Sequence, residues 1–332
     1  MLARSPGRWQ MQPWQRELAA AFTRPAELLA YLGLDPALTA PVAWPLLVPR
    51  GFAALMVPGD PADPLLRQVL PSAAEGLATP GYSTDPLAEA AARRAPGLLC
   101  KYRGRALLLV TKACAVHCRY CFRRHSHTPA TGPAIAGLEA ALQALAADPG
   151  IHEVILSGGD PLLLDDVALR ALIARLAALP HLRRLRLHTR VPVLLPARIT
   201  PTLVDLLTGT RLAPVMVIHT NHAAELGDAA AAALDRLGRA RIPLLNQGVL
   251  LRGVNDSSAV LAALAERLFA LGVINYYLHL LDPVQGAAHF AVPRSRARAL
   301  LRALRAELPG YLVPRLVCEV AGAPSKLPID AA

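Results

Sequence analysis

The chain has 332 residues, of which 54% are hydrophobic and 18% are charged, and its formal charge at pH 7 is +11. This apolar content excludes a disordered chain and is enough to bury a large core. No run of about 18 uninterrupted apolar residues indicates a membrane span, and the N-terminus lacks the apolar run of a signal peptide. The composition therefore predicts a globular protein of the cytoplasm.

The positive charge is spread along the chain. It comes from 32 arginines and only 3 lysines, and the arginines recur in Ala- and Leu-rich helical segments such as 168–187 and 294–308. A solvated helical face explains this pattern better than a nucleic-acid surface, so we expect no direct nucleic-acid partner. Because the chain so rarely uses lysine, Lys101, Lys112 and Lys326 are candidates for positions where an amine is required.

Residues 1–100 are predicted to form a helical N-terminal extension. This region is rich in Pro and Ala, with a helical segment at 13–34 and turn clusters at 57–64 and 78–86.

Residues 101–332 alternate short apolar runs with Ala- and Leu-rich helical segments. This alternation is typical of a parallel α/β sheet, and the number of units favours a partial or full parallel β/α barrel. The predicted strands are 106–111, 152–158, 182–190, 214–220, 242–250, 274–282 and 315–320.

Polar residues follow the C-terminal end of each predicted strand. Three cysteines follow the first strand, SGGDP ends the second, HTR and HTNH end the next two, and NQG lies on the fifth. Asp282 ends the sixth strand, and CEVAGAPSK follows the seventh. Because these ends form the catalytic mouth of a β/α barrel, the pattern indicates an enzyme.

The three cysteines, Cys114, Cys118 and Cys121, have the spacing C-x3-C-x2-C. Three thiolates can hold three corners of a [4Fe–4S] cluster and leave one iron open for a non-protein ligand. The alternative is a zinc site completed by His117 or His125, but structural zinc is usually held by two spaced ligand pairs. The spacing favours the cluster, and a zinc-bearing nucleic-acid-binding module stays open as a function of another class.

The segment CAVHCRYC at 114–121 resembles the signature of the radical S-adenosylmethionine (SAM) superfamily. LSGGDPL at 156–162 resembles the glycine-rich strand edge that receives the amino group of SAM in that superfamily. The resemblance implies that a reduced cluster splits SAM into methionine and a 5′-deoxyadenosyl radical. The cofactor contacts that it implies are Gly158, Gly159 and Asp160, with His219 and Gln247 near SAM unless they only form hydrogen bonds in the core.

From about Tyr102 to the end of the chain, the order and spacing of the motifs resemble the lysine 2,3-aminomutase family. GAPSKLP at 322–328 resembles the family's pyridoxal phosphate (PLP) loop, which identifies Lys326 as the catalytic lysine that binds PLP. A lysine amine can form an imine with an aldehyde cofactor, whereas arginine cannot. Arg105 matches an arginine near PLP, with a strand-edge salt bridge as its alternative role.

The family's substrate, lysine, carries a carboxylate at one end and an ammonium group at the other. The resemblance assigns Arg123 to the α-carboxylate, which a planar guanidinium can bind through two hydrogen bonds. It assigns Asp282 and Glu319 to the side-chain ammonium group. Glu319 stands where free-lysine mutases generally have Asp, so the distal end of the site differs by one methylene.

The resemblance implies an isomerase that converts (S)-α-lysine to (R)-β-lysine with a [4Fe–4S] cluster, SAM and PLP. A reductant protein such as flavodoxin or ferredoxin is the implied electron donor. The chain most resembles the shorter branch that supplies (R)-β-lysine for modification of elongation factor P, because FRRH follows the third cysteine and six residues follow Lys326. An indirect link to elongation factor P and its lysylating ligase follows, and a stand-alone lysine or other amino-acid 2,3-aminomutase is the alternative.

Overall fold

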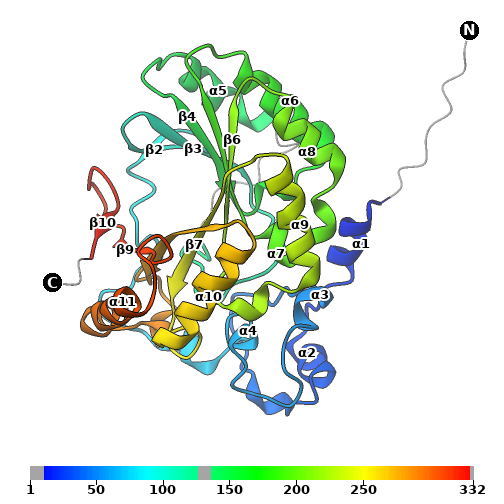
Figure 1. Cartoon of the computed structure of the whole chain (residues 1–332), viewed down its shortest axis with the longest axis vertical. Helices are drawn as coiled ribbons and strands as arrows, with labels where there is room; N and C mark the ends of the chain where they lie inside the picture. The colour runs from blue at the N-terminus through cyan, green and yellow to red at the C-terminus, as the bar shows by residue number, and fades with distance from the viewer. Residues whose placement is uncertain (1–10, 126–135, 330–332) are drawn as a thin grey trace, which may run out of the picture.

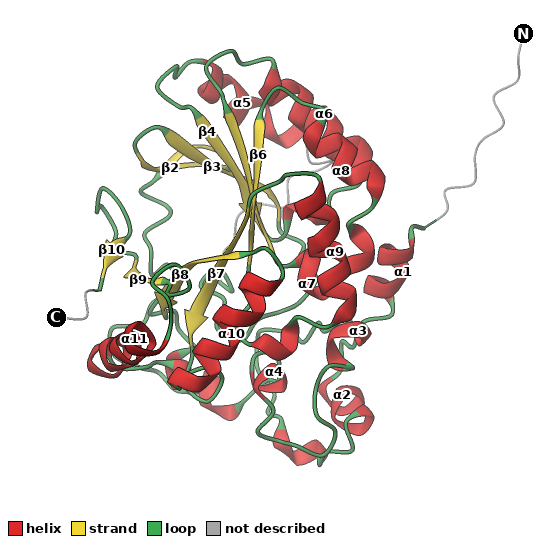
Figure 2. Ribbon diagram, in the orientation of Figure 1, coloured by secondary structure: helices red, strands yellow, loops and turns green. Residues whose placement is uncertain are grey.

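The computed structural model describes residues 11–125 and 136–329, so the first ten residues, where no signal peptide is expected, lie outside the described part. Its centre is a set of seven parallel strands, β3–β9, that neighbour one another in chain order (Figures 1 and 2). Each predicted strand is present, with ends within two residues of those expected. The prediction of a parallel β/α fold is confirmed.

The sheet is open. It contains ten strands, and antiparallel strands continue it at both edges: β2 pairs with β3 at one edge and β10 pairs with β9 at the other. The fold is therefore a partial barrel. The strands are β1 (Arg93–Ala95), β2 (Leu98–Tyr102), β3 (Arg105–Thr111), β4 (Glu153–Gly158), β5 (Arg184–Thr189), β6 (Ala213–Ile218), β7 (Leu244–Leu250), β8 (Ile274–Leu280), β9 (Arg315–Cys318) and β10 (Leu327–Pro328).

Helices connect successive strands and pack along one side of the sheet (Figure 2). Short polar side chains cap the start of some of them: Asp165 accepts a hydrogen bond from Ala168 N at 2.7 Å, and Ser257 caps a later helix in the same way. The α-helices are α1 (Pro13–Ala19), α2 (Pro25–Tyr31), α3 (Arg50–Ala53), α4 (Pro64–Arg67), α5 (Glu139–Ala146), α6 (Asp166–Ala177), α7 (Val191–Leu194), α8 (Pro201–Thr208), α9 (Asp228–Arg239), α10 (Ser258–Ala270) and α11 (Arg294–Glu307).

The hydrophobic core runs across the predicted division at residue 100. Phe52 and Leu66 from the N-terminal helices belong to the same buried cluster as Leu108 on β3 and Leu156 on β4. We propose that residues 1–100 form a helical extension and residues 101–332 form the barrel. The extension packs directly against the sheet. Short 3₁₀ helices complete the fold: η1 (Pro36–Leu38), η2 (Ala73–Gly76), η3 (Ala136–Leu138), η4 (Pro161–Leu163), η5 (Pro196–Arg198), η6 (Ala223–Glu225) and η7 (Ala288–Phe290).

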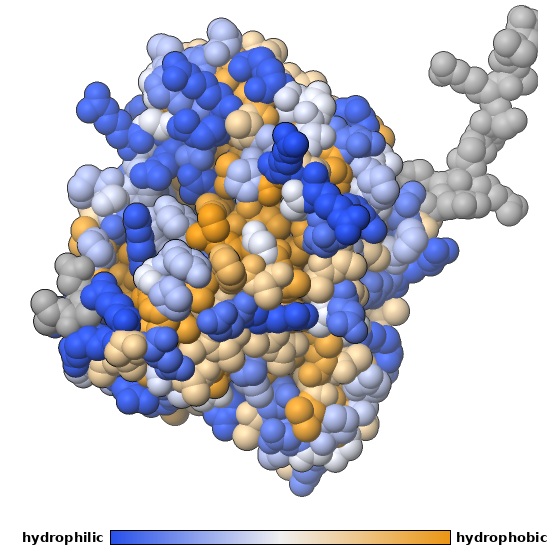
Figure 3. Space-filling view, in the orientation of Figure 1, coloured by the Kyte–Doolittle hydropathy of each residue, from blue (hydrophilic) through white to orange (hydrophobic). Residues whose placement is uncertain are grey.

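The surface seen in Figure 3 has hydrophilic side chains spread around its margin, with apolar side chains gathered near its middle. Within residues 11–125 and 136–329, no helix combines the length and the apolar character that a bilayer span requires.

Candidate active site

A cavity of about 330 Å³ is lined by residues at the C-terminal ends of the parallel strands. It brings the cysteine loop at 114–121 and Lys326 to one place, although about 200 residues of chain separate them. Every residue that the sequence assigned to the site lines this cavity. These are Arg105, Cys114, Cys118, Cys121, Arg123, Gly158, Gly159, Asp160, His219, Gln247, Asp282, Glu319 and Lys326.

Two arginines, Arg119 within the cysteine loop and Arg124 just after it, anchor the loop to the N-terminal region. Arg119 donates from Nε to Glu75 Oε1 at 2.8 Å, and Arg124 forms an ion pair with the same carboxylate. Burial alone would raise the pKa of Glu75, but the two guanidinium groups hold it below its usual value. A charged glutamate in η2 therefore fixes the conformation of the loop that carries the thiols.

All three cysteines are free thiols. Burial, with the charge of the neighbouring thiols, raises the pKa of Cys114 and takes that of Cys121 to about 11. Within the described residues, no three His, Cys, Asp or Glu side chains are arranged to hold a single metal ion. A cluster in which each cysteine binds a different iron does not require the sulfurs to converge, so the donor set fits a [4Fe–4S] cluster.

Gly158, the last residue of β4, and Gly159 allow the chain between β3 and the cysteine loop to approach that strand closely. A Cβ on Gly158 would lie 2.4 Å from Thr111 O, and one on Gly159 would lie 2.1 Å from Ala113 O. The sequence suggested that glycine is needed here so that the backbone can approach a ligand. The structure gives a further reason for glycine, because neighbouring backbone leaves no room for a side chain. Gly159 N donates to Thr111 O at 2.6 Å, so the corner is part of the support of the loop.

Asp160 lines the cavity, but protein groups already use its carboxylate. Thr189 Oγ1 and the backbone N of Arg190 each donate to it at 2.7 Å, and Leu162 N donates at 3.1 Å. Burial raises its pKa, against these hydrogen bonds. Asp160 thus ties the glycine corner to the end of β5.

Lys326 lies in an ion-paired group at the other side of the cavity. Its Nζ is 3.1 Å from Glu319 Oε2, and Tyr102 donates to Glu319 Oε1 at 2.8 Å. Lys101 is also close, with its Nζ 3.7 Å from Glu319 Oε1. Burial would raise the pKa of Glu319, but the two lysines and Tyr102 lower it to about 2. Burial also lowers the pKa of Lys326, which makes the neutral, nucleophilic amine more accessible.

Arg105 is suited to hold an anionic group beside Lys326. Its guanidinium lies over the ring of Tyr102, 5.0 Å from the centroid. Its Nε is buried and has no hydrogen-bond partner among the described residues. Because buried donors are normally paired, this unpartnered N–H fits a phosphate such as that of PLP.

Arg123 is held by a carboxylate that the sequence reasoning did not select. Its Nε and Nη2 donate to Glu89 at 2.9 and 2.8 Å, and its Nη1 donates to Ser157 Oγ at 3.2 Å. Lys101 pairs with Glu89 at 3.1 Å. Glu89 thus orients both cations, and their charge holds its pKa below the usual value despite burial.

Asp282 differs from Glu89 and Glu319, which both pair with lysines. It has no ion pair among the described residues, and burial together with the nearby charge of Glu319 raises its pKa to about 7. A cationic ligand group would favour its charged form.

His219 and Gln247 line the cavity, and His219 contacts Tyr120 of the cysteine loop. Tyr120 Oη is 2.8 Å from His219 Nε2, and burial lowers the pKa of His219 to about 4. A neutral imidazole in a hydrogen-bonded setting agrees with the alternative that the sequence left open for this residue.

The sequence reasoning missed the residues that support the site from distant parts of the chain. Lys101 had a signal, the scarcity of lysine, which also singled out the exposed Lys112. Others had none, because none of them lies directly at the end of a predicted strand. They are Gln68, Glu75, Glu89 and Glu225.

Comparisons with known proteins agree with this arrangement. The family model described as the radical SAM superfamily matches residues 108–265. An L-lysine 2,3-aminomutase from Escherichia coli is 47% identical over 96% of this chain and 95% of its own length. One from Haemophilus influenzae is 43% identical over 98% of both chains.

Among solved structures, Streptococcus suis SuiB bound to precursor peptide SuiA matches with a TM-score of 0.50 and 12% identity. The match covers 67% of this chain and 50% of that one, so it shows the fold alone. The identity to near full-length relatives shows more: the chain belongs to the lysine 2,3-aminomutase family of radical SAM enzymes.

Proposed function

We propose that this isomerase converts (S)-α-lysine to (R)-β-lysine for the modification of elongation factor P. The observation that carries the proposal is the single cavity that holds three free thiols, a lysine amine, and both acidic and basic side chains. The family uses a [4Fe–4S] cluster, SAM and PLP, and the donor set of the cavity fits the cluster and the PLP.

Cys114, Cys118 and Cys121 would hold the cluster, and Lys326 would hold PLP. When bound, the cluster and SAM supply a carbon radical for hydrogen abstraction, and PLP supplies the carbonyl that takes up the substrate amine. The chain's own contribution is to orient these groups and to exclude stray hydrogen donors. The half-buried amine of Lys326, with its lowered pKa, is suited to exchange with the amine of a substrate.

Opposite charges at the two ends of lysine give the roles of the remaining residues. Arg123, which is held by Glu89, would bind the α-carboxylate through the donor edge that faces Ser157. Asp282 and Glu319 would bind the side-chain ammonium group. Since no described residue forms an ion pair with Asp282, an ammonium group beside it would bring the missing positive charge.

The finer assignments rest on the resemblance to the shorter branch of the family. FRRH at 122–125 supports the link to elongation factor P and its lysylating ligase. A flavodoxin or ferredoxin would supply the electron. Five unpaired cysteines are consistent with the reducing cytoplasm.

An anaerobic assay tests the proposal directly. The full-length protein, reconstituted with iron, sulfide, SAM and PLP, is incubated with a panel of free amino acids, and the products are separated by chiral chromatography. We expect (R)-β-lysine from lysine alone. Addition of elongation factor P and its ligase should then give the β-lysylated factor.

The outcomes separate the proposal from its alternative. β-Lysine that the ligase does not transfer, or faster turnover of another amino acid, would favour a stand-alone aminomutase. Loaded protein that produces no β-amino acid would contradict the proposal.

A further inference from the structure

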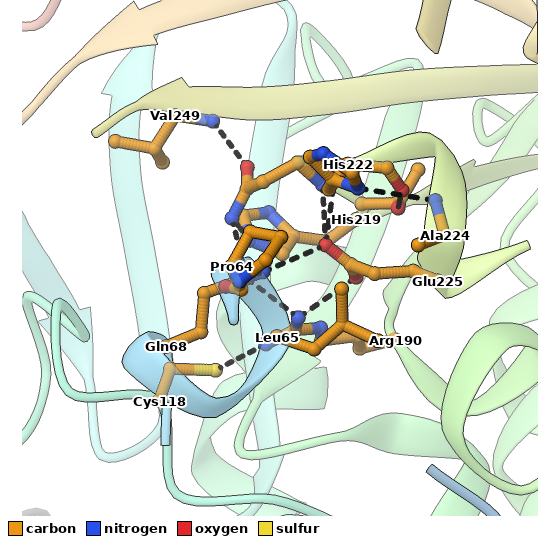
Figure 4. Close-up of polar contacts among 12 residues, drawn as sticks. Pro64, Leu65, Gln68, Cys118, Arg190, His219, His222, Ala224, Glu225 and Val249 are labelled. Atoms are coloured by element: carbon orange, nitrogen blue, oxygen red, sulfur yellow. Dashed lines mark hydrogen bonds and ion pairs between the residues drawn. The ribbon is translucent and has the colours of Figure 1, made fainter. Parts of the chain in front are cut away.

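A buried polar network lies behind the cysteine loop and consists of Arg190, Gln68 and Glu225. Arg190 Nη1 lies 2.9 Å from Cys118 Sγ (Figure 4). This is a charged N–H group that donates to the sulfur of a proposed cluster ligand. The roles assigned above to the cavity residues do not use it.

The side chain of Arg190 is fixed from the side away from the sulfur. Its Nη2 donates to Gln68 Oε1 at 2.9 Å and to Glu225 Oε2 at 2.8 Å. Its guanidinium also lies 5.5 Å from the ring centroid of Phe52. The side chains of Arg190 and Glu225 are 7% and 0% exposed, so water does not compete for these contacts.

The two partners are themselves fully engaged. Glu225 Oε1 accepts from Gln68 Nε2 at 3.0 Å and from Asn221 N at 2.9 Å. Gln68 Oε1 accepts from Asn221 Nδ2 at 3.0 Å. Because Asp160 also holds the backbone N of Arg190, both ends of the residue are fixed and Nη1 has a defined direction.

We propose that Arg190 is a positioning residue for the cluster, whose hydrogen bond orients the thiolate of Cys118 and raises the reduction potential of the cluster. The proposal rests on the proposed function for the presence of that cluster. The physical reason is that hydrogen bonds and positive charge at a ligand sulfur stabilise the reduced, more negative state. Glu225 moderates this effect because its carboxylate compensates the charge of Arg190.

The test uses the reconstituted full-length protein without SAM or lysine, so that neither ligand changes the potential. Arg190→Gln removes the positive charge. Arg190→Lys keeps the charge but lacks the planar guanidinium group that can donate to the sulfur and to Glu225 at the same time. Arg198→Gln is the matched control, since Arg198 is also a buried arginine, donates to Leu162 O at 2.8 Å, and does not line the cavity. Iron and sulfide content and an EPR-monitored redox titration are measured.

We expect Arg190→Gln to lower the midpoint potential by about 59 mV, a tenfold change in the reduced-to-oxidised ratio for one electron. Arg190→Lys should recover part of the shift, and Arg198→Gln should keep the wild-type potential. If Arg190→Gln carries the cluster at the wild-type potential, the inference is wrong.

If Arg190→Gln takes up no cluster while Arg198→Gln does, the potential of Arg190→Gln cannot be measured. Glu225→Gln then provides the test. It removes the compensating charge, so the potential should rise, and an unchanged potential would overturn the inference. Wild-type protein that binds no iron–sulfur cluster would overturn the proposed function, and this inference with it. The two failures are therefore distinguishable.

Discussion

At the scale of single residues, three carboxylates in or beside the cavity have different electrostatic settings. Glu89 and Glu319 each face a lysine and a further donor, and their pKa values are lowered. Among the described residues Asp282 has no such partner, and its pKa is raised to about 7. The charge of Asp282 therefore depends on pH near neutrality.

We predict that the KM for lysine falls as the pH rises through 7. Below pH 7, Asp282 is protonated and attracts the ammonium group of lysine weakly; above it, the carboxylate is charged. Steady-state kinetics between pH 6 and 8.5 measure the effect. Asp282→Asn should raise the KM and remove this pH dependence, and a variant with the wild-type profile would exclude Asp282 from the site.

The same titration affects the stability of the fold. Because the folded-state pKa of Asp282 is raised above its unfolded value, the folded protein binds more protons between about pH 4 and pH 7. The stability that the protonated Asp282 contributes is present at low pH and is lost as the pH rises toward and through 7, so the free energy of unfolding falls. Urea unfolding at pH 5.5 and pH 8 measures this change. The free energy of unfolding should fall more between the two pH values in the wild type than in Asp282→Asn, which has no carboxyl group to titrate at this position.

Glu89→Gln is predicted to raise the KM for lysine about tenfold, the equivalent of about 1.4 kcal/mol. The amide cannot form the charged bidentate pair that holds Arg123, so the carboxylate site loses its fixed geometry. Glu27→Gln, the same exchange at an exposed ion pair, should leave the KM unchanged. A lower KM in Glu89→Gln would mean that Glu89 competes with the substrate for Arg123.

Lys326→Arg is predicted to abolish covalent attachment of PLP. Borohydride reduction of PLP-loaded protein fixes the cofactor on the lysine that binds it, and peptide mass spectrometry identifies that residue. Lys101→Arg tests the other amine of the cavity and Lys112→Arg an exposed one. Both variants should still carry PLP on Lys326; PLP found on Lys101 in the wild type would reject the assignment.

At the scale of elements, the corner between β4 and η4 supports the cysteine loop. We predict that Gly159→Ala destabilises the fold by about 1–3 kcal/mol and lowers iron uptake, because its Cβ would meet Ala113 O at 2.1 Å. Gly238→Ala is the control. A Cβ there meets nothing within 4 Å inside α9, so that variant should be more stable by about 0.5–1 kcal/mol. Denaturant unfolding and iron analysis measure both.

The sequence was informative about elements because buried parallel strands leave a local signal. Apolar runs located β3–β9, and the polar residues after each run pointed to one rim of the sheet. The short strands β1, β2 and β10 have no such pattern. Gln68 and Glu225 reach Arg190 only through the tertiary fold, so no local pattern could have identified them.

At the scale of the whole molecule, the N-terminal region and the sheet share one core. All three tryptophans lie before residue 45, and the described ones, Trp14 and Trp44, belong to that region. Tryptophan fluorescence therefore reports on the N-terminal region, whereas far-UV circular dichroism reports on all helices. We predict that thermal unfolding followed by the two probes coincides, because one continuous core favours a single cooperative transition.

A fluorescence change that precedes the loss of ellipticity would show that the N-terminal region melts alone. In that case Phe52 and Gln68 would leave Arg190 without two of its contacts while the sheet still stands. The cluster would then be lost before the fold.

Lys326 directly precedes β10, which is the shortest strand of the described sheet. β10 contributes two exposed residues, Leu327 and Pro328, which pair with Cys318 and Val317, and proline offers no N–H to such a ladder. Detaching a strand of this kind requires little free energy, whereas the thiols on the opposite wall are pinned by buried ion pairs. In the proposed function, the amine of Lys326 can therefore move aside once a substrate amine has replaced it, while the loop that carries the thiols stays fixed.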